Sequence, residues 1–112
     1  MRMDKLTNQL QNALADAQSL AVGRDHQFIE PVHVLKALLE QQGGATRPLL
    51  QKAGANLGQL IGNVDAAVGQ LPTVSGASGD VHISQETSRL LNRADKLAQR
   101  NNDAYLSSEW VL

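Results

Sequence analysis

Apolar residues recur at helical spacing along the first part of the chain. They fall three or four positions apart, with some adjacent pairs, which places them on one face of an α-helix. The stripe consists of Leu6, Leu10, Ala13, Leu14, Ala17, Leu20 and Ala21. Gly23 follows it and is expected to end the helix in the left-handed conformation that glycine adopts at helix C-termini. The pattern predicts a first helix that closes at Gly23.

A second helix is predicted from Pro31, because the missing N–H of proline needs no partner at the first helical position. Its expected buried stripe is Val32, Leu35, Leu38 and Leu39. Gly43 and Gly44 are expected to stop it.

Two further helices complete the first half of the chain. Thr46 is expected to cap a short helix that has Pro48 in its first turn and closes at Gly54, and Asn56 is expected to cap a longer one. The stripe of the longer helix is Leu57, Leu60, Ile61, Val64, Val68 and Leu71. Pro72 ends the first half.

The second half begins after the only stretch that is typical of a linker, residues 73–80, which lack periodicity and are rich in Gly and Ser. Ser84 is predicted to cap a helix that reaches about Arg100. Its stripe is Leu90, Leu91, Ala94, Leu97 and Ala98. After a turn over residues 101–105, a last helix is predicted to start near Ser107.

The two halves repeat each other at an offset of 77 positions. In the first half the repeated residues are Ala17, Leu20, Ala21, Phe28, Ile29, Val34 and Leu35, and in the second they are Ala94, Leu97, Ala98, Tyr105, Leu106, Val111 and Leu112. We predict one all-α domain of two helical repeats related by a pseudo-twofold axis. Residues 1–72 form the first repeat, 73–83 the inter-repeat loop and 84–112 a truncated second repeat. The seam between them is a natural binding surface.

Composition excludes several function classes. Ten Lys and Arg against eleven Asp and Glu leave a net charge of −1, which gives no general attraction to nucleic acid or to an anionic membrane. Cysteine is absent, and no apolar run approaches the length of a membrane span. A soluble, cytoplasmic protein without a membrane or nucleic-acid partner is expected.

Catalytic motifs are also missing from the sequence. There is no phosphate-binding loop, and the nearest stretch, residues 76–80, lacks a lysine. His26, His33 and His82 are expected to lie far apart, without a second ligand at helical spacing, so we expect no metal. His33 is expected to make a structural hydrogen bond at the start of its helix, with a ligand role as the alternative. We predict no enzymatic activity and no cofactor for this chain.

Several segments together resemble a known family. They are residues 15–21 (ADAQSLA), 28–35 (FIEPVHVL), 37–39 (ALL), 79–81 (GDV), 95–99 (DKLAQ) and 106–109 (LSSE). They closely resemble the N-terminal domains of the ClpB disaggregase family, within the Clp N-terminal domain family of AAA+ chaperones. The likeness covers essentially the whole chain, and the paired repeat is typical of this family.

The resemblance implies a function. The parent protein would be a ring-forming homohexamer that uses ATP, bound by modules outside this chain, to thread aggregated polypeptides. This domain, monomeric when isolated, would weakly capture exposed apolar segments of unfolded or aggregated polypeptides. The alternative is the adaptor-docking domain of a protease-associated Clp ATPase.

The resemblance also indicates site residues. Thr7, Asp103 and Glu109 match positions that the family uses to couple substrate to activity. Each also has an ordinary explanation: a helix cap, a turn, or a carboxylate that complements a helix N-terminus. For the apolar wall of the groove we expect Leu91 and Trp110, although Leu91 also suits the core. Trp110 is the better candidate for an exposed anchor.

Some relatives recognise phosphorylated arginine through a glutamate present in both repeats. Here the second repeat has Glu109, but the first has Val32 at the matching position. The loss of one carboxylate argues against phosphoarginine recognition and favours the disaggregase interpretation.

A basic stripe follows one face of the helix after Ser84. It consists of Arg89, Arg93, Lys96 and Arg100. A solvated face partly paired with Glu86 and Asp95 is the main expectation. Docking on the ATPase ring and weak nucleic-acid contact are the alternatives.

Overall fold

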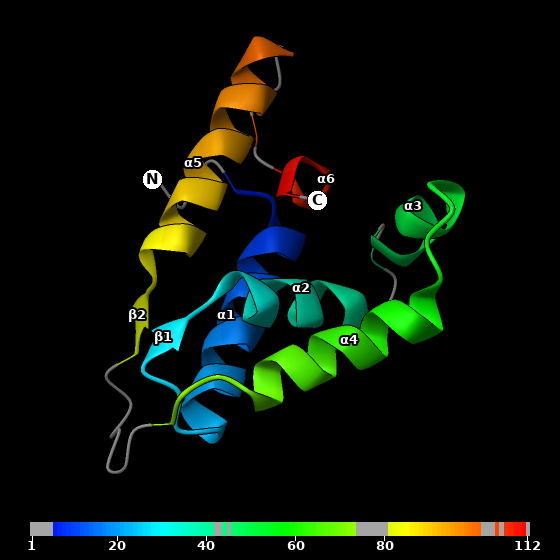
Figure 1. Ribbon diagram of the computed structural model, residues 1–112. Helices are drawn as coiled ribbons and strands as arrows, with labels where there is room; N and C mark the ends of the chain where they lie inside the picture. Colours follow the sequence, from blue (N-terminus) through cyan, green and yellow to red (C-terminus); the bar gives the residue numbers. More distant parts are fainter. Residues whose placement is uncertain are drawn as a thin grey trace.

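The computed structural model describes residues 6–41, 44, 46–73, 81–101, 105 and 107–111, with Glu109 described by its backbone alone. The elements are α1 (Asn8–Gly23), β1 (Phe28–Ile29), α2 (Pro31–Glu40), α3 (Thr46–Lys52), α4 (Leu57–Gly69), β2 (His82–Ile83), α5 (Gln85–Arg100) and α6 (Ser108–Val111). Figure 1 shows α1 and α2 at the centre, α5 and α6 above them, and α4 passing below α2 toward α3 on the right. The predicted all-α class is confirmed.

Side-chain caps fix the starts of the two longest helices as predicted. The Oγ1 of Thr7 accepts a hydrogen bond from the N–H of Leu10 at 3.3 Å. The Oγ of Ser84 accepts one from the N–H of Thr87 at 3.1 Å. Each bond satisfies a donor that the first helical turn leaves without a partner.

α1 ends at Gly23 as predicted, but Gly23 does not adopt the predicted left-handed conformation. Gly23 is the last helical residue, and the cap is Arg24, with a φ of −108°. The left-handed position belongs to Asp25, with a φ of 59°. Aspartate tolerates this conformation better than most residues, because its short side chain can hydrogen-bond locally.

The two longest helices occupy matching positions in the two halves of the sequence, at the offset of 77. α1 and α5 both contain 16 residues, and their ends differ by 77 positions at each terminus. α2 starts at Pro31 and α6 at Ser108, again 77 positions apart. The pseudo-twofold relation between the halves remains a prediction.

Two short parallel strands join the halves and were not predicted. Phe28 pairs with His82 and Ile29 with Ile83. The hydroxyl of Thr87, in the first turn of α5, donates to the carbonyl of Ile29 at 2.7 Å. These contacts attach the start of α5 to the chain before α2. Most of the predicted linker, residues 74–80, lies outside the described residues.

The main core lies between α1, α2 and α5. Its buried members are Leu6, Leu10, Ala13, Ala17, Ala21, Ile29, Val34, Ala37, Leu38, Ala94 and Ala98. Alanines of α1 and α5 lie in this cluster, where their small side chains fill the space between larger aliphatic neighbours. A smaller cluster of Leu39, Val64 and Val68 packs α4 against α2.

The buried face of α2 differs from the predicted stripe. His33, Val34 and Ala37 are buried along with Leu38 and Leu39, whereas Val32 and Leu35 are only partly buried. The cause is that α2 packs against both α1 and α4. A helix between two neighbours buries more than one stripe.

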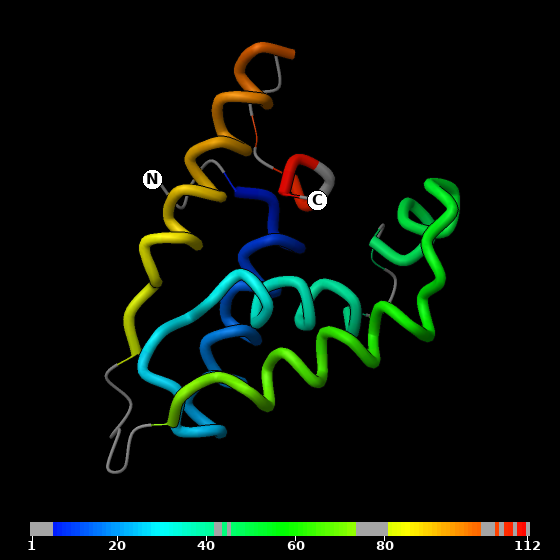
Figure 2. The backbone as a smooth tube through the Cα atoms, viewed as in Figure 1, coloured from blue at the N-terminus to red at the C-terminus, as the bar shows by residue number. Residues whose placement is uncertain are grey.

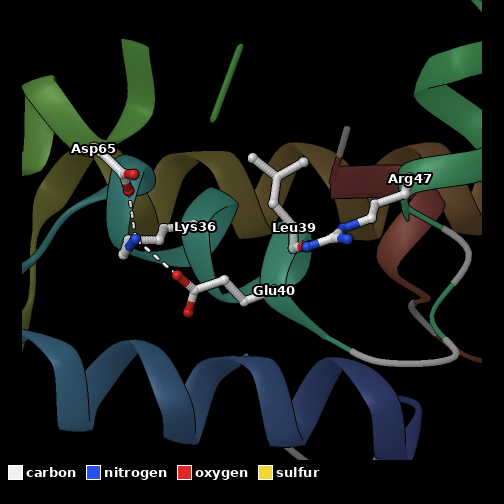
Figure 3. Close-up of polar contacts among 5 residues, drawn as sticks. All are labelled: Lys36, Leu39, Glu40, Arg47 and Asp65. Carbon is white, nitrogen blue, oxygen red and sulfur yellow. Dashed lines mark hydrogen bonds and ion pairs between the residues drawn. The ribbon is translucent and has the colours of Figure 1, made fainter. Parts of the chain in front are cut away.

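Polar contacts attach α2 to α3 and α4 (Figure 3). The ammonium of Lys36 bonds to Asp65 of α4 and lies 2.7 Å from a carboxylate oxygen of Glu40. The hydrogen bonds with Asp65 and Glu40 raise the pKa of Lys36 above its usual value. The Nε of Arg47 donates to the carbonyl of Leu39.

The short helix α3 differs slightly from expectation. Thr46 is its first residue rather than its cap, and the side chain is buried. Gly54 follows in the left-handed conformation, with a φ of 89°, as the predicted closing glycine should. The expected stop at Gly43 lies outside the described residues, and α2 ends with Gln41 as its cap.

Candidate functional site

Two of the sequence-predicted site residues, Thr7 and Trp110, belong to the region where α1, α5 and α6 meet. Figure 1 shows the start of α1 between α5 and α6, and α6 packs against α5. Leu6, just before α1, and Leu10, in its first turn, are buried in the main core, and Trp110 of α6 packs against the same cluster. The smooth backbone trace in Figure 2 shows the same arrangement. We call this region the α1–α5–α6 junction.

Thr7 and Trp110 are the predicted residues with accessible surface at the junction. Both side chains are partly buried. Thr7 caps α1, so its ordinary structural role is observed. A further role for Thr7 in binding remains a prediction. Trp110 covers part of the core while keeping some of its surface open, as expected for an aromatic anchor.

Leu91 does not form an exposed wall in this structure. Its side chain is only 5% exposed, on the face of α5 that also buries Thr87, Ala94 and Ala98. The physical reason is helical spacing, which places residues three, four and seven positions apart on one face. Leu91 therefore stabilises the packing of α5. This is the core role that the sequence offered as the alternative for this residue.

The two predicted carboxylates cannot be placed relative to the junction. Asp103 and the side chain of Glu109 lie outside the described residues. The backbone of Glu109 belongs to α6, directly before Trp110. Their roles in binding remain predictions from the family resemblance.

Two exposed apolar residues, one on α5 and one between α5 and α6 in the chain, were missed as site candidates. Leu97, in the last turns of α5, is 43% exposed, and Tyr105, between α5 and α6, is 61% exposed. Leu97 directly precedes the buried Ala98, so it stands at the edge of the stripe. Tyr105 matches Phe28 of the first repeat, which is also exposed. For Leu97, the signal available in the sequence was its position at the edge of the apolar stripe of α5.

The prediction that the histidines lie far apart is wrong for one pair. The Nδ1 of His26 lies 2.8 Å from the Nε2 of His33, and both rings are buried. The turn after α1 reverses the chain and brings His26 against the start of α2. His82, in β2, is exposed. No group of three metal-binding side chains occurs within the part of the chain that the structure describes.

His33 makes the structural hydrogen bond that was predicted for it. Its Nδ1 accepts from the N–H of Glu30 at 2.8 Å, closing a capping box at the start of α2. A neutral His33 therefore carries its proton on Nε2 and donates it to His26. Burial lowers the pKa of His33 to about 4, with contributions from the nearby His26 and Arg24.

The basic stripe of α5 is fully solvated. Arg89, Arg93, Lys96 and Arg100 are all exposed. They lie opposite the buried face of the helix. The ion pairs among the described residues do not include the expected pairing with Glu86 or Asp95, and an Asp95 carboxylate oxygen accepts from the amide of Gln99 at 3.1 Å.

An aliphatic groove of about 350 Å³ borders the main core, with which it shares Val34 and Leu38. It is lined by Pro31, Val32, Val34, Leu35, Leu38, Leu50, Leu60, Leu90 and Val111. α2 forms one wall, and the other elements contribute single residues. None of the lining side chains is polar.

Within the described residues, no helix combines the length and the apolar character needed to cross a membrane. The described residues at the junction offer a binding partner the partly open ring of Trp110 and the helix cap Thr7.

Comparison with known proteins identifies similar chains. Residues 5–112 match the family described as "Clp repeat (R) N-terminal domain". The chain is 54% identical over its full length to the chaperone protein ClpB of Pseudomonas putida and 50% identical to that of Vibrio cholerae. It spans 13% of the length of each of these relatives.

Solved structures show the same fold. The N-terminal domain of Hsp104 from Candida albicans aligns with a TM-score of 0.86 at 20% identity, covering 96% of this chain and 70% of that one. The N-domain of ClpV from Vibrio cholerae aligns with a TM-score of 0.83 at 25% identity, covering 96% of this chain and 64% of that one.

Proposed function

Because the chain belongs to the Clp repeat N-terminal domain family and is a ClpB-type chaperone N-domain, we propose that it captures exposed apolar segments of unfolded or aggregated polypeptides. The α1–α5–α6 junction is the proposed binding surface. The domain itself is not the ATPase. ATP hydrolysis and threading belong, in this proposal, to modules of a hexameric parent protein.

The observation that carries the proposal is the accessible apolar surface of α5, of α6 and of Tyr105 between them in the chain. Leu97 and Tyr105 are 43% and 61% exposed, and Trp110 keeps part of its surface open. Exposed apolar residues are ordinary on protein surfaces, but tryptophan and tyrosine are enriched among the residues that carry binding energy. Thr7 lies at the start of α1 within the same junction.

Such a surface should bind weakly and with little sequence preference. Burying apolar area contributes about 25 cal/mol per Å². A few side chains without a deep pocket must still offset the entropy of ordering a flexible chain, so affinities of about micromolar or weaker are expected. Several copies on one ring would raise the apparent affinity.

Backbone amide NMR with a permanently unfolded polypeptide tests the proposal. We expect shift changes at Thr7, Leu97, Tyr105 and Trp110 that saturate with added polypeptide. Tyr105→Ala should weaken binding by about threefold or more, since aromatic contacts carry much of such binding energy. Phe28→Ala is the matched control, because Phe28 is an exposed aromatic at the equivalent position of the first repeat. It belongs to β1, which Figure 1 shows apart from α6.

Two outcomes would overturn the proposal. One is the absence of shift changes at high polypeptide concentration. The other is equal weakening by Tyr105→Ala and Phe28→Ala, which would indicate contact without a defined site. A folded adaptor that shifts the junction resonances where unfolded polypeptide does not would establish adaptor docking, the alternative function, in its place.

A further inference from the structure

The basic stripe of α5 consists of four exposed cations that the fold itself does not use. Arg89, Arg93, Lys96 and Arg100 are all exposed. The ion pairs of the described part of the chain involve Lys36 of α2 and none of these four side chains. We propose that the basic stripe binds acidic residues of the captured polypeptide, beside an apolar contact at Leu97. This inference rests on the proposed function and names its substrate class, which is apolar segments flanked by acidic residues.

The matching helix of the first half shows that the fold does not require these charges. At the offset of 77, the stripe corresponds to exposed positions of α1, which are Asn12, Asp16, Ser19 and Gly23. Those four positions carry no positive charge, although both helices contain 16 residues and begin with a hydroxyl side chain as the cap. The positive charge is therefore specific to α5.

The stripe also works against the stability of α5. Its members lie four, three and four positions apart, so each is a neighbour of the next on the helix surface. Like charges at these spacings destabilise a helix, and only Arg100, in the last turn, complements the helix dipole. A local cost that brings no structural gain is typical of a functional surface.

The spacing of the stripe suits an acidic polypeptide. Successive cations are separated by about 6, 4.5 and 6 Å along the helix axis, at about 1.5 Å per residue. Acidic side chains three or four positions apart on a helix, or two apart on an extended chain, have similar separations. Leu97 is 43% exposed and lies four positions after Arg93, so an apolar residue of the same polypeptide can contact it.

Nucleic acid is a less suitable partner for this helix. α5 contains no aromatic residue on which a base could stack. The chain has a net charge of −1, which gives no general attraction to a phosphate backbone. Leu97 adds an apolar contact that phosphates cannot use. A polypeptide with both acidic and apolar residues matches the charge of the stripe and the surface beside it.

Three peptides that share one apolar segment test the proposal. Their flanks are glutamate, lysine, or glycine and serine, and fluorescence anisotropy measures their binding to the 112-residue chain. At low salt we expect the glutamate-flanked peptide to bind about fivefold more tightly than the neutral one, because each exposed ion pair contributes modestly. The lysine-flanked peptide should bind more weakly than the neutral one. Both differences should shrink at about 0.5 M salt, which screens exposed charges.

A pair of double variants separates the stripe from the net charge. Arg93→Gln with Lys96→Gln should remove the preference for glutamate flanks. Arg24→Gln with Lys52→Gln is the matched control, because both residues are exposed outside α5 and the change in net charge is the same. Circular dichroism establishes that both variants are folded. An unchanged preference in the α5 variant, or an equal loss in the control, would overturn the proposal.

The peptides also distinguish failure of this proposal from failure of the proposed function. Equal binding of all three peptides would overturn the acidic preference and leave the capture of apolar segments intact. Binding of the glutamate-flanked peptide without binding of the neutral one would contradict apolar capture and leave the stripe as an acid-binding surface. A single-stranded oligonucleotide that bound more tightly than the glutamate-flanked peptide would assign the stripe to nucleic acid instead.

Discussion

The imidazole rings of His26 and His33 share one hydrogen bond of 2.8 Å in the interior, and His33 holds a second one to the N–H of Glu30. The pair joins the turn after α1 to the start of α2. Protonating His33 on Nδ1 would remove the acceptor for Glu30 and place a charge in a buried site. The contact therefore depends on a neutral His33.

Acid should weaken the fold through His33. Its pKa falls to about 4 in the folded protein, from 6.5 in the unfolded chain. The unfolded state therefore binds more protons between these values, so stability is complete above about pH 6.5 and is lost as the pH falls toward 4. We expect this group to lower the free energy of unfolding by about 2 kcal/mol between pH 7.5 and pH 5.

Urea unfolding at pH 7.5, 6 and 5 measures this effect. His33→Gln should flatten the pH dependence, at some cost in stability at pH 7.5. His82→Gln, at an exposed position, should leave the wild-type profile unchanged. A His33→Gln protein with the full wild-type slope would show that carboxylates, not this histidine, cause the acid sensitivity.

Two buried threonines should respond in opposite directions to the same substitution. Thr46 and Thr87 are 1% and 0% exposed. The Thr87 hydroxyl donates to the carbonyl of Ile29 at 2.7 Å, whereas the Thr46 hydroxyl has no hydrogen-bond partner in the described structure. Thr→Val keeps the shape and removes the hydroxyl. Leaving a buried polar group unsatisfied costs about 1–3 kcal/mol.

We therefore expect Thr87→Val to lower the free energy of unfolding by about 1–3 kcal/mol and Thr46→Val to leave it unchanged or raise it by up to about 1 kcal/mol. Thermal and urea unfolding of the two variants give the comparison. A loss at Thr46 as large as that at Thr87 would reveal a partner for its hydroxyl and contradict the assignment.

The sequence predicted the helices well because each has strong local signals. Thr7, Ser84 and Asn56 act as caps and Pro31 starts α2, as predicted from residue type alone. Local chemistry and periodicity determine these positions. The two strands escaped prediction because two residues are too few to show alternation.

The site was harder to predict because its features depend on tertiary contacts. The His26–His33 pair forms only when the turn after α1 brings together residues with no helical spacing. Burial of Leu91 and exposure of Leu97 differ because the neighbours of α5 cover one side of its stripe. Such differences along one apolar stripe follow from packing, which the hydrophobic pattern does not encode.

A pair of Leu→Ala substitutions on α5 should separate stability from binding. Leu91 is 5% exposed and Leu97 is 43% exposed. Leu91→Ala leaves a cavity in the interior and should lower the free energy of unfolding by about 2–4 kcal/mol. Leu97→Ala should cost less than about 1 kcal/mol, because much of its side chain is already in water.

Binding should show the reverse order. If the junction captures apolar segments, Leu97→Ala weakens the binding of unfolded polypeptide, while Leu91→Ala retains it at temperatures where the variant is folded. Circular dichroism establishes folding, and fluorescence anisotropy of a labelled unfolded polypeptide measures binding. If folded Leu91→Ala lost more binding than Leu97→Ala, Leu91 would belong to the binding surface after all.

Two glycines give a final test of the backbone assignment. Gly23 lies at the last position of α1, and an added Cβ would meet no atom within 4 Å, whereas Gly54 has a φ of 89°. Gly23→Ala should raise the free energy of unfolding by about 0.5 kcal/mol, since alanine is the better helix former. Gly54→Ala should lower it by about 1–2 kcal/mol, because a Cβ is strained in the left-handed conformation. Urea unfolding of both variants decides the matter. The opposite order would place the left-handed residue at Gly23, as the sequence pattern predicts, and remove the role that the structure gives to Asp25.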